Sequence, residues 1–368
     1  MLILIGANQA ELATSLQIDL AQTGLLTAML STGLGLGILT GGKLVGRSHR
    51  RTIFILFSAI ISISLVSVEE VMSFQRTIAH IFFVGFGAGT CMTFLNTMAS
   101  EHYHERAAKA LAILHGSVTI GAITGPFAVR WILQEHPWST SFHLTGLLIF
   151  FISLWAIFTN FPTPQHGHHD SNGDPQNTIR LFPAILPLAA IGMCYVGIET
   201  VVITFAIPFA RDSLGQSILN GQAGISIYWV GILLGRLGIL TLRGEFGSRA
   251  LLLGGTVAIA CCLGAFILHP LPIELITFAI GLSLGSTYPV LIAYTGYTFA
   301  HRRARAIALV SFCGSLGGFT IPWLTGTIGD AQGMSTAGVS MFIWFLILSS
   351  AAFIAHRAKL RRLATSLP

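Results

Sequence analysis

The sequence predicts an all-α polytopic membrane protein with twelve transmembrane helices in two pseudo-symmetric six-helix halves. Three observations support this prediction: an apolar composition, apolar stretches of membrane-spanning length, and an internal repeat. Of the 368 residues, 53% are hydrophobic and 9% are charged, and the mean hydropathy is +0.76. Soluble globular chains carry about 25% charged residues. This deficit of charge excludes an ordinary soluble domain.

Apolar stretches near 20 residues long predict transmembrane helices, because the hydrocarbon core of a bilayer is about 30 Å thick. Eleven such stretches lie near residues 24–42, 52–68, 77–99, 110–132, 144–161, 181–209, 224–242, 249–268, 274–299, 306–328 and 337–355. A twelfth, MLILIGANQAELATSL (1–16), is cut short by the start of the chain. We expect either a start further upstream or a helix that begins inside the bilayer. No signal-peptide pattern precedes this stretch, so we expect no cleaved leader.

Lysine and arginine residues gather in one set of loops. Sixteen of the 20 lie after every second predicted helix and in the C-terminal tail, whereas Arg76, Arg130 and Arg211 lie in the opposite loops. Cytoplasmic loops carry an excess of positive charge. We therefore expect a multi-pass protein of the cytoplasmic (inner) membrane with both termini in the cytoplasm. The net charge of +6 then faces anionic membrane lipids rather than nucleic acid.

The chain repeats itself at an offset of 196 residues without a gap. The aligned pairs include Arg106 with Arg302, Lys109 with Arg305, Pro126 with Pro322, Gly85 with Gly281, and Gly89 with Gly285. The repeat defines an N-terminal half, residues 1–160, and a C-terminal half, residues 181–368. The polar join at 161–180, rich in Pro, Gly and His, predicts a flexible cytoplasmic linker. Parallel repeats around a midplane site are typical of secondary transporters.

The loop GGKLVGRSHRR (41–51), after the second predicted helix, resembles the loop signature of the major facilitator superfamily. In that signature, glycines let helices pack closely, and arginines cap and pair near helix ends. The resemblance implies gating or structural roles for Gly42, Arg47, Arg50, Arg51, and Arg243, which aligns with Arg47 in the repeat. The usual acidic residue of the signature is absent, because Val45 and Gly46 stand in its place.

Four further segments resemble the fucose permease and glucose/mannose:proton symporter branch of that superfamily. They are GFGAGTCMTFLN (85–96), LAILHGSVTIGAITGP (111–126), YVGIETVVITF (195–205) with YWVGILLGRLG (228–238), and FAIGLSLGSTYPVLIA (278–293). The resemblance implies a monomeric sugar symporter that works by alternating access, with a small-molecule substrate and protons as partners. The sequence shows no Ser-His-Asp set, Walker loop or zinc-ligand spacing, so we expect no cofactor, no metal and no catalytic residue, and we do not expect an enzyme. An exporter of a drug-like, lipid-like or other amphipathic compound and a non-transporting membrane sensor are the alternatives.

Glu199 lies in the middle of the apolar run YVGIETVV (195–202). A carboxylate at a helix centre costs roughly 3 kcal/mol on insertion scales, so we expect this side chain to face a cavity or a partner. One interpretation is a structural carboxylate satisfied by Arg236. The other is a cavity carboxylate that binds substrate hydroxyls or carries a proton, as this segment lines the cavity in the resembling symporters. Tyr195, one helical turn earlier, would share the face of Glu199.

Proton coupling has a second candidate carboxylate in the first predicted helix. The resembling sugar symporters place an intramembrane Glu in the fourth helix, but this chain has Met92 there, which cannot carry a proton. Glu11 is the substitute, with a solvated position at the end of its helix as the alternative. Arg236 is interpreted as a gating or structural residue, with anionic-substrate recognition as the alternative. The remaining candidates for the cavity wall are Asn8, Asn96, His115, Tyr228, Trp229 and Tyr288, of which His115 has a packing role as the alternative and the three aromatic rings could stack on a sugar.

Overall fold

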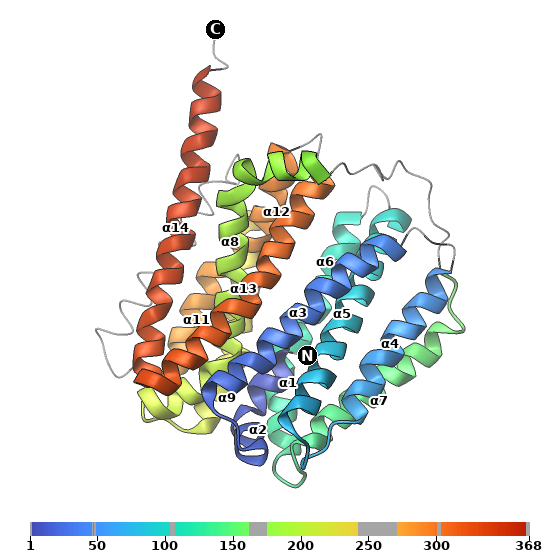
Figure 1. Cartoon of the computed structure of the whole chain (residues 1–368), viewed down its shortest axis with the longest axis vertical. Coiled ribbons are helices and arrows are strands. Elements are labelled where there is room, and N and C mark those ends of the chain that lie inside the picture. Colours follow the sequence, from blue (N-terminus) through green and yellow to red (C-terminus); the bar gives the residue numbers. More distant parts are fainter. Residues whose placement is uncertain are drawn as a thin grey trace.

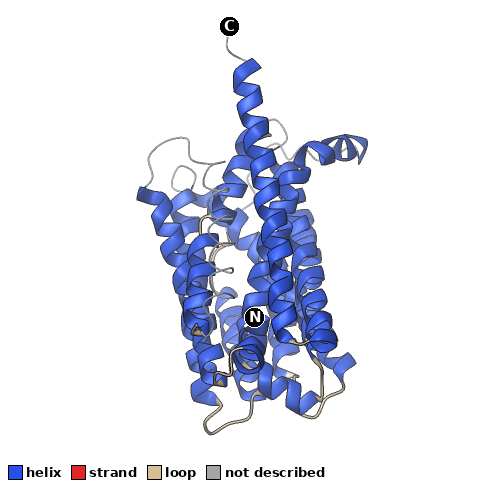
Figure 2. Ribbon diagram, turned by 90° about the vertical axis from the view of Figure 1, so that its left-hand side faces the viewer, coloured by secondary structure: helices blue, strands red, loops and turns tan. Residues whose placement is uncertain are grey.

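The computed structural model describes the backbone of residues 2–45, 47, 49–103, 107–161, 175–241, 271–299 and 303–365. Every regular element in these ranges is a helix, and the helices run side by side along the long axis (Figure 2). Eight of the described helices are long and apolar enough to cross a membrane. The apolar composition therefore takes the all-helical form that the sequence predicts.

The elements follow the predicted order. They are α1 (Leu2–Ala7), α2 (Gln9–Leu16), α3 (Leu20–Leu44), α4 (Arg50–Val66), α5 (Phe74–Tyr103), α6 (Ala107–Ile132), α7 (Ser139–Ala156), α8 (Pro175–Pro208), the π-helix η2 (Phe209–Ser213), α9 (Ile218–Thr241), α11 (Ile273–Leu284), α12 (Thr287–Thr298), α13 (Arg303–Gln332) and α14 (Met334–Thr365). Helix α8 begins at Pro175, inside the predicted linker 161–180, and residues 162–174 of that linker lie outside the described ranges.

Two hydrophobic cores hold the bundle together. One joins buried residues of α1–α5 and α7, and the other joins buried residues of α8–α14 and takes in a few side chains of the preceding helices, such as Ala122 of α6. Figure 1 shows α3–α7 on one side and α8 with α11–α14 on the other, with α1, α2 and α9 between them at the lower end. We refer to α1–α7 as the N-terminal helices and to α8–α14 as the C-terminal helices.

A close helix crossing built from four glycines occurs once in each group of helices. Helix α3 meets α5 through Gly33, Gly37, Gly85 and Gly89, and α9 meets α11 through Gly231, Gly235, Gly281 and Gly285. A Cβ atom at any of these positions would overlap a backbone carbonyl of the facing helix. Close backbone approach of this kind is what small residues provide in membrane helices. The second crossing thus repeats the first, and two of its four glycines, Gly281 and Gly285, align with Gly85 and Gly89 in the sequence repeat.

The two groups of helices touch each other at the end of the bundle remote from the linker. There Asp330 of α13 accepts hydrogen bonds from the backbone N–H groups of Leu20 (3.0 Å) and Ala21 (2.6 Å) of α3. Gly24 packs against the carbonyl of Pro322, and further along the pair Gly35 packs against Ser315. Nearer the linker, a Cβ atom on Gly42 would meet no atom within 4 Å. Among the described residues, the α3–α13 contact is therefore tightest at the end remote from the linker.

Candidate functional site

The structure brings Glu199 together with three tyrosines and one arginine. Glu199 is partly buried on α8 and interacts electrostatically with Tyr195 on the same helix and with Tyr228 and Arg236 on α9. Tyr288 of α12 also lies within electrostatic reach of the Glu199 carboxylate. We call Tyr195, Glu199, Tyr228, Arg236 and Tyr288 the Glu199 cluster. All five residues were candidates in the sequence, and the other four thus lie around Glu199.

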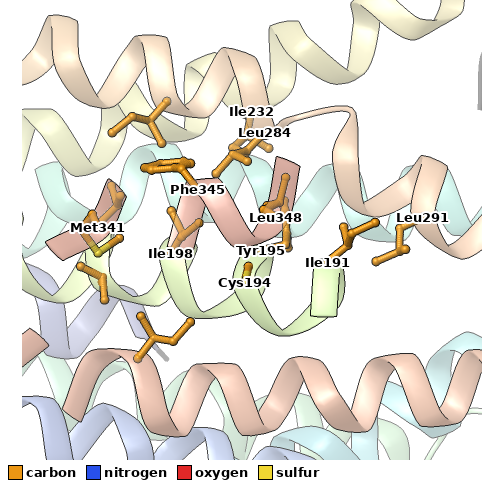
Figure 3. Close-up of a cluster of buried hydrophobic side chains, with 14 of the residues drawn as sticks. Ile191, Cys194, Tyr195, Ile198, Ile232, Leu284, Leu291, Met341, Phe345 and Leu348 are labelled. Atoms are coloured by element: carbon orange, nitrogen blue, oxygen red, sulfur yellow. The ribbon is translucent and has the colours of Figure 1, made fainter. Parts of the chain in front are cut away.

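Apolar packing fixes the rings of this cluster. Tyr195 belongs to a buried apolar cluster that also contains Ile198, Ile232 and Leu284 and so joins α8, α9 and α11 (Figure 3). Its ring stacks on that of Tyr288, with centroids 5.3 Å apart and an interplanar angle of 27°. The rings are held by burial, so their polar groups keep fixed positions in the site.

Several polar groups at this site have no hydrogen-bond partner of good geometry among the described residues. They are the hydroxyls of Tyr195 and Tyr228, Nε1 of Trp229 and Nε of Arg236. Tyr195, Tyr228 and Trp229 are each at least nine-tenths buried. A buried unpaired polar group costs about 1–3 kcal/mol, and most buried polar groups in proteins are paired. The arrangement therefore offers hydrogen bonds to a ligand that carries acceptor oxygens.

One face of α9 connects this cluster to the N-terminal helices. Gln222, Trp229 and Arg236 follow each other at intervals of seven residues, which places them on one face. Gln222 Nε2 donates to the carbonyl of Ala7 (3.0 Å), and an Arg236 terminal nitrogen donates to Thr119 Oγ1 on α6 (3.3 Å). Trp229 therefore lies on the face that meets the N-terminal helices. Arg236 therefore links Thr119 on α6 with Glu199 on α8, and its gating or structural role stays a prediction.

The predicted candidates on the N-terminal helices do not join the Glu199 cluster as a group. His115 is exposed one turn before Thr119 on α6 and interacts electrostatically with Arg236, so it borders the cluster. Asn8 is fully buried, and its amide nitrogen donates to Ser141 Oγ of α7 (2.9 Å). Glu11 on α2 and Asn96 on α5 are partly buried at other positions.

Some of the packing and pairing predicted for the loop 41–51 occurs in the structure, and some does not. Arg50 is buried and its Nε donates to the carbonyl of Val45 (2.7 Å), and Arg51 donates to the carbonyl of Ile157 (3.0 Å). Both arginines thus satisfy carbonyls at helix ends, as the signature predicts. The expectation of close packing at Gly42 is wrong: this glycine is exposed, and the preceding Gly41 packs against Thr90 and Thr93 instead. Arg47 is exposed, and Arg243 lies outside the described residues.

Sequence reasoning missed Thr119, Gln222 and Asp330, the residues that link the two groups of helices. The seven-residue spacing of Gln222, Trp229 and Arg236 was a signal for Gln222. Thr119 and Asp330 carry no such signal, because their roles depend on which helices face each other.

A separate apolar hollow of about 470 Å³ lies between α8, α11, α13 and α14. Among the N-terminal helices, α4 packs against α5 at Gly87 and against α7 at Gly146. The counterpart of α4 at the repeat offset is residues 246–262, outside the described ranges. This hollow is therefore not assigned to a substrate. The described residues also contain no group of three or more His, Cys, Asp or Glu side chains placed to hold a metal.

Comparison with known proteins identifies the family of this fold. The family model of the Major Facilitator Superfamily matches residues 1–322. The chain belongs to the major facilitator superfamily. It is 24% identical to the glucose/mannose transporter GlcP of Bacillus subtilis (strain 168), over 92% of this chain and 85% of that protein. It is also 24% identical to the multidrug resistance protein MdtL of Vibrio parahaemolyticus serotype O3:K6, over 96% of this chain and 90% of that protein.

Solved structures share the fold. The nucleoside transporter NupG matches with a TM-score of 0.75 at 14% identity, covering 96% of both chains. A bacterial homologue of the human lysosomal transporter Spinster, in an inward-facing and unoccupied conformation, matches with a TM-score of 0.71 at 18% identity, covering 98% of this chain and 95% of that one. The protein is therefore a multi-pass membrane transporter of this superfamily, and the predicted resemblance to the glucose/mannose branch is confirmed.

Proposed function

We propose that this protein is a secondary transporter of the cytoplasmic membrane that moves a small polar solute, a sugar, by alternating access. The observation that carries this proposal is the set of fixed, unpartnered donors in and beside the Glu199 cluster. A sugar offers many hydroxyl oxygens to such donors and apolar ring faces to Tyr228, Trp229 and Tyr288. Glu199 would accept hydrogen bonds from the same hydroxyls. The similarity to GlcP, a glucose/mannose transporter, supports this solute class.

We further propose twelve transmembrane helices in two halves, residues 1–160 and 181–368, with the linker end in the cytoplasm. The repeated four-glycine crossings support two equivalent halves, and the excess of Lys and Arg supports the orientation. The contact of Asp330 with α3 then closes the outer end. Transport would alternate between this state and one in which the outer contact opens.

Coupling to an ion gradient would act through Glu199 or Glu11, which are carboxylates inside predicted membrane helices. The sequence predicts a proton as the coupling ion, and Glu199 would carry it next to the substrate. Membrane-embedded ionisable groups mark ion pathways in transporters.

An exporter of amphipathic compounds is the second candidate function. The similarity to MdtL, a multidrug resistance protein, supports it at the same identity as the similarity to GlcP. The two candidates differ in what the Glu199 cluster would bind: a sugar transporter would bind hydroxyl-rich solutes, and an exporter would bind amphipathic cations. A sensor that binds without transporting differs from both by showing no flux.

Solute counterflow in proteoliposomes tests the proposal. Vesicles loaded with unlabelled hexose should exchange it for external radiolabelled hexose when they contain the wild-type protein, and vesicles without protein should not. Hexoses, nucleosides and amphipathic cations are measured in the same vesicles. Exchange of amphipathic cations without exchange of any sugar would replace the sugar assignment with the exporter.

A further inference from the structure

The first membrane helix is interrupted inside the predicted span. Helix α1 ends at Ala7 and α2 begins at Gln9, with Asn8 at φ −98° and ψ 11° between them. The carbonyl of Ala7 instead accepts a buried hydrogen bond from Gln222 of α9. Interrupted membrane helices whose freed carbonyls bind cations are a recurring feature of secondary transporters.

Three unpartnered side-chain oxygens surround this break. They are Oδ1 of Asn8, Oε2 of Glu11 and Oε1 of Gln222, each buried and without a hydrogen-bond partner among the described residues. Asn8 is 0% exposed and Gln222 is 4% exposed. Asn8 is the N-cap residue of α2 and Glu11 is the third residue of that helix, so their side chains lie at the same helix end. Gln222 is tied to the same place through Ala7, so the oxygens lie within about one turn of the break.

The unpartnered groups at this break differ from those at the Glu199 cluster. At the break they are oxygens that accept hydrogen bonds, whereas in and beside the cluster they are O–H and N–H groups that can donate. A proton on Glu11 would satisfy one pair of oxygens and leave the others unpaired. A metal cation with several oxygen ligands satisfies all of them together, since hard cations take carboxylate, amide and carbonyl oxygens.

We propose that the Ala7 carbonyl, Asn8, Glu11 and Gln222 form a Na⁺ site that couples ion binding to transport. The single carboxylate of Glu11 balances one positive charge, and a divalent ion would leave an uncompensated buried charge. Gln222 comes from the C-terminal helices and the other ligands come from the N-terminal helices. The site is therefore complete only when α9 docks on α1, so Na⁺ occupancy would favour the docked arrangement. As a coupling site, it rests on the proposed transport function.

Thermal unfolding of the purified full-length protein tests the site without requiring transport. The protein is unfolded in NaCl and in KCl at equal ionic strength. A ligand that binds the folded state raises its stability in a saturable manner, so NaCl should raise the unfolding temperature above that in KCl, with saturation. Glu11→Gln should abolish the difference, and Gln222→Met should require at least tenfold more Na⁺ for half of the effect. Glu135→Gln, which removes an exposed carboxylate, should leave the Na⁺ effect unchanged.

Equal unfolding temperatures of the wild type in NaCl and KCl would overturn the Na⁺ site, and this comparison needs no variant to fold. Retention of the Na⁺ effect in Glu11→Gln would also overturn it. Hexose counterflow on the same preparation separates this failure from failure of the proposed function. Counterflow at the same rate in Na⁺ and in K⁺, together with equal unfolding temperatures, would support the sugar transporter and contradict the Na⁺ site. A Na⁺-dependent stability without any sugar counterflow keeps the site and removes the sugar assignment.

Discussion

Replacing Asp330 with alanine should open the outer end of the transporter. In the structure, the Asp330 carboxylate accepts from the backbone N–H groups of Leu20 (3.0 Å) and Ala21 (2.6 Å) at the start of α3. These bonds join α13 to α3 across the two groups of helices. Asp19 caps the same helix terminus from within the N-terminal helices, by accepting from the N–H of Gln22 (2.7 Å). The two carboxylates therefore serve one helix end but differ in what they connect.

The size of the effect follows from these contacts. A carboxylate near a helix N-terminus contributes about 0.3–1 kcal/mol at an exposed site and up to about 2 kcal/mol in favourable geometry. Asp330 is exposed, so solvent screening limits the gain, and two bonds to adjacent N–H groups place it at about 1 kcal/mol, the upper end of the exposed range. The outer-open to outer-closed ratio should therefore rise about fivefold in Asp330→Ala. Asp19→Ala weakens the α3 cap in both states and should leave the ratio unchanged.

Distance measurement between spin labels on the exposed residues Val71 and Gln332 reports this ratio, after the five native cysteines are replaced by alanine. The longer distance should gain population in Asp330→Ala and not in Asp19→Ala. Equal distance distributions for Asp330→Ala and the wild type, or the same shift in both variants, would refute the assignment of Asp330 as an outer latch.

Three further predictions concern packing and the cluster. Gly85→Ala should lower the free energy of unfolding by about 1–3 kcal/mol, because the added Cβ would overlap a carbonyl of α3. Gly42→Ala should leave the free energy of unfolding unchanged, because the added Cβ would meet no atom within 4 Å. Chemical denaturation in detergent measures both variants, and equal losses would contradict the close crossing of α3 and α5. Tyr195→Phe should weaken hexose binding about 5- to 100-fold, because the buried hydroxyl has no hydrogen-bond partner of good geometry among the described residues. Equilibrium binding measures this, and unchanged affinity would remove this hydroxyl from the site. Thr119→Val should remove the acceptor of Arg236 and cost about 0.6 kcal/mol of stability, and a cost above 2 kcal/mol would show that Thr119 has another role.

The helical membrane fold could be predicted from the sequence because apolar length and composition act locally along the chain. The sequence also carried a signal for the crossings of α3 with α5 and of α9 with α11, since Gly85 and Gly89 recur as Gly281 and Gly285. Close backbone approach needs glycine wherever it occurs, so the repeat in sequence reappears as a repeat in geometry. Gly42 shows the limit of this reasoning: a glycine in a signature loop need not face a neighbouring helix.

The candidate site was predictable in its residues but not in its connections. Glu199 and Arg236 stood out because charges are rare inside membrane helices, and the structure brings them together. The partners of Arg236 and Gln222 could not be predicted, since the rotation of α9 about its axis decides which helix each side chain meets. The interruption at Asn8 also escaped prediction, although Gly6 lies two residues before it, because the contact of the Ala7 carbonyl with the distant Gln222 depends on which helices face each other.

Equilibrium binding of radiolabelled hexose to the purified full-length protein tests the central claim most directly. The claim is that the Glu199 cluster holds the sugar, so the wild type and Glu135→Gln should bind with the same affinity, and Glu199→Gln should bind at least tenfold more weakly. Circular dichroism and the unfolding temperature confirm that each variant is folded. Equal hexose affinity in Glu199→Gln and the wild type, with both proteins folded, would contradict the account.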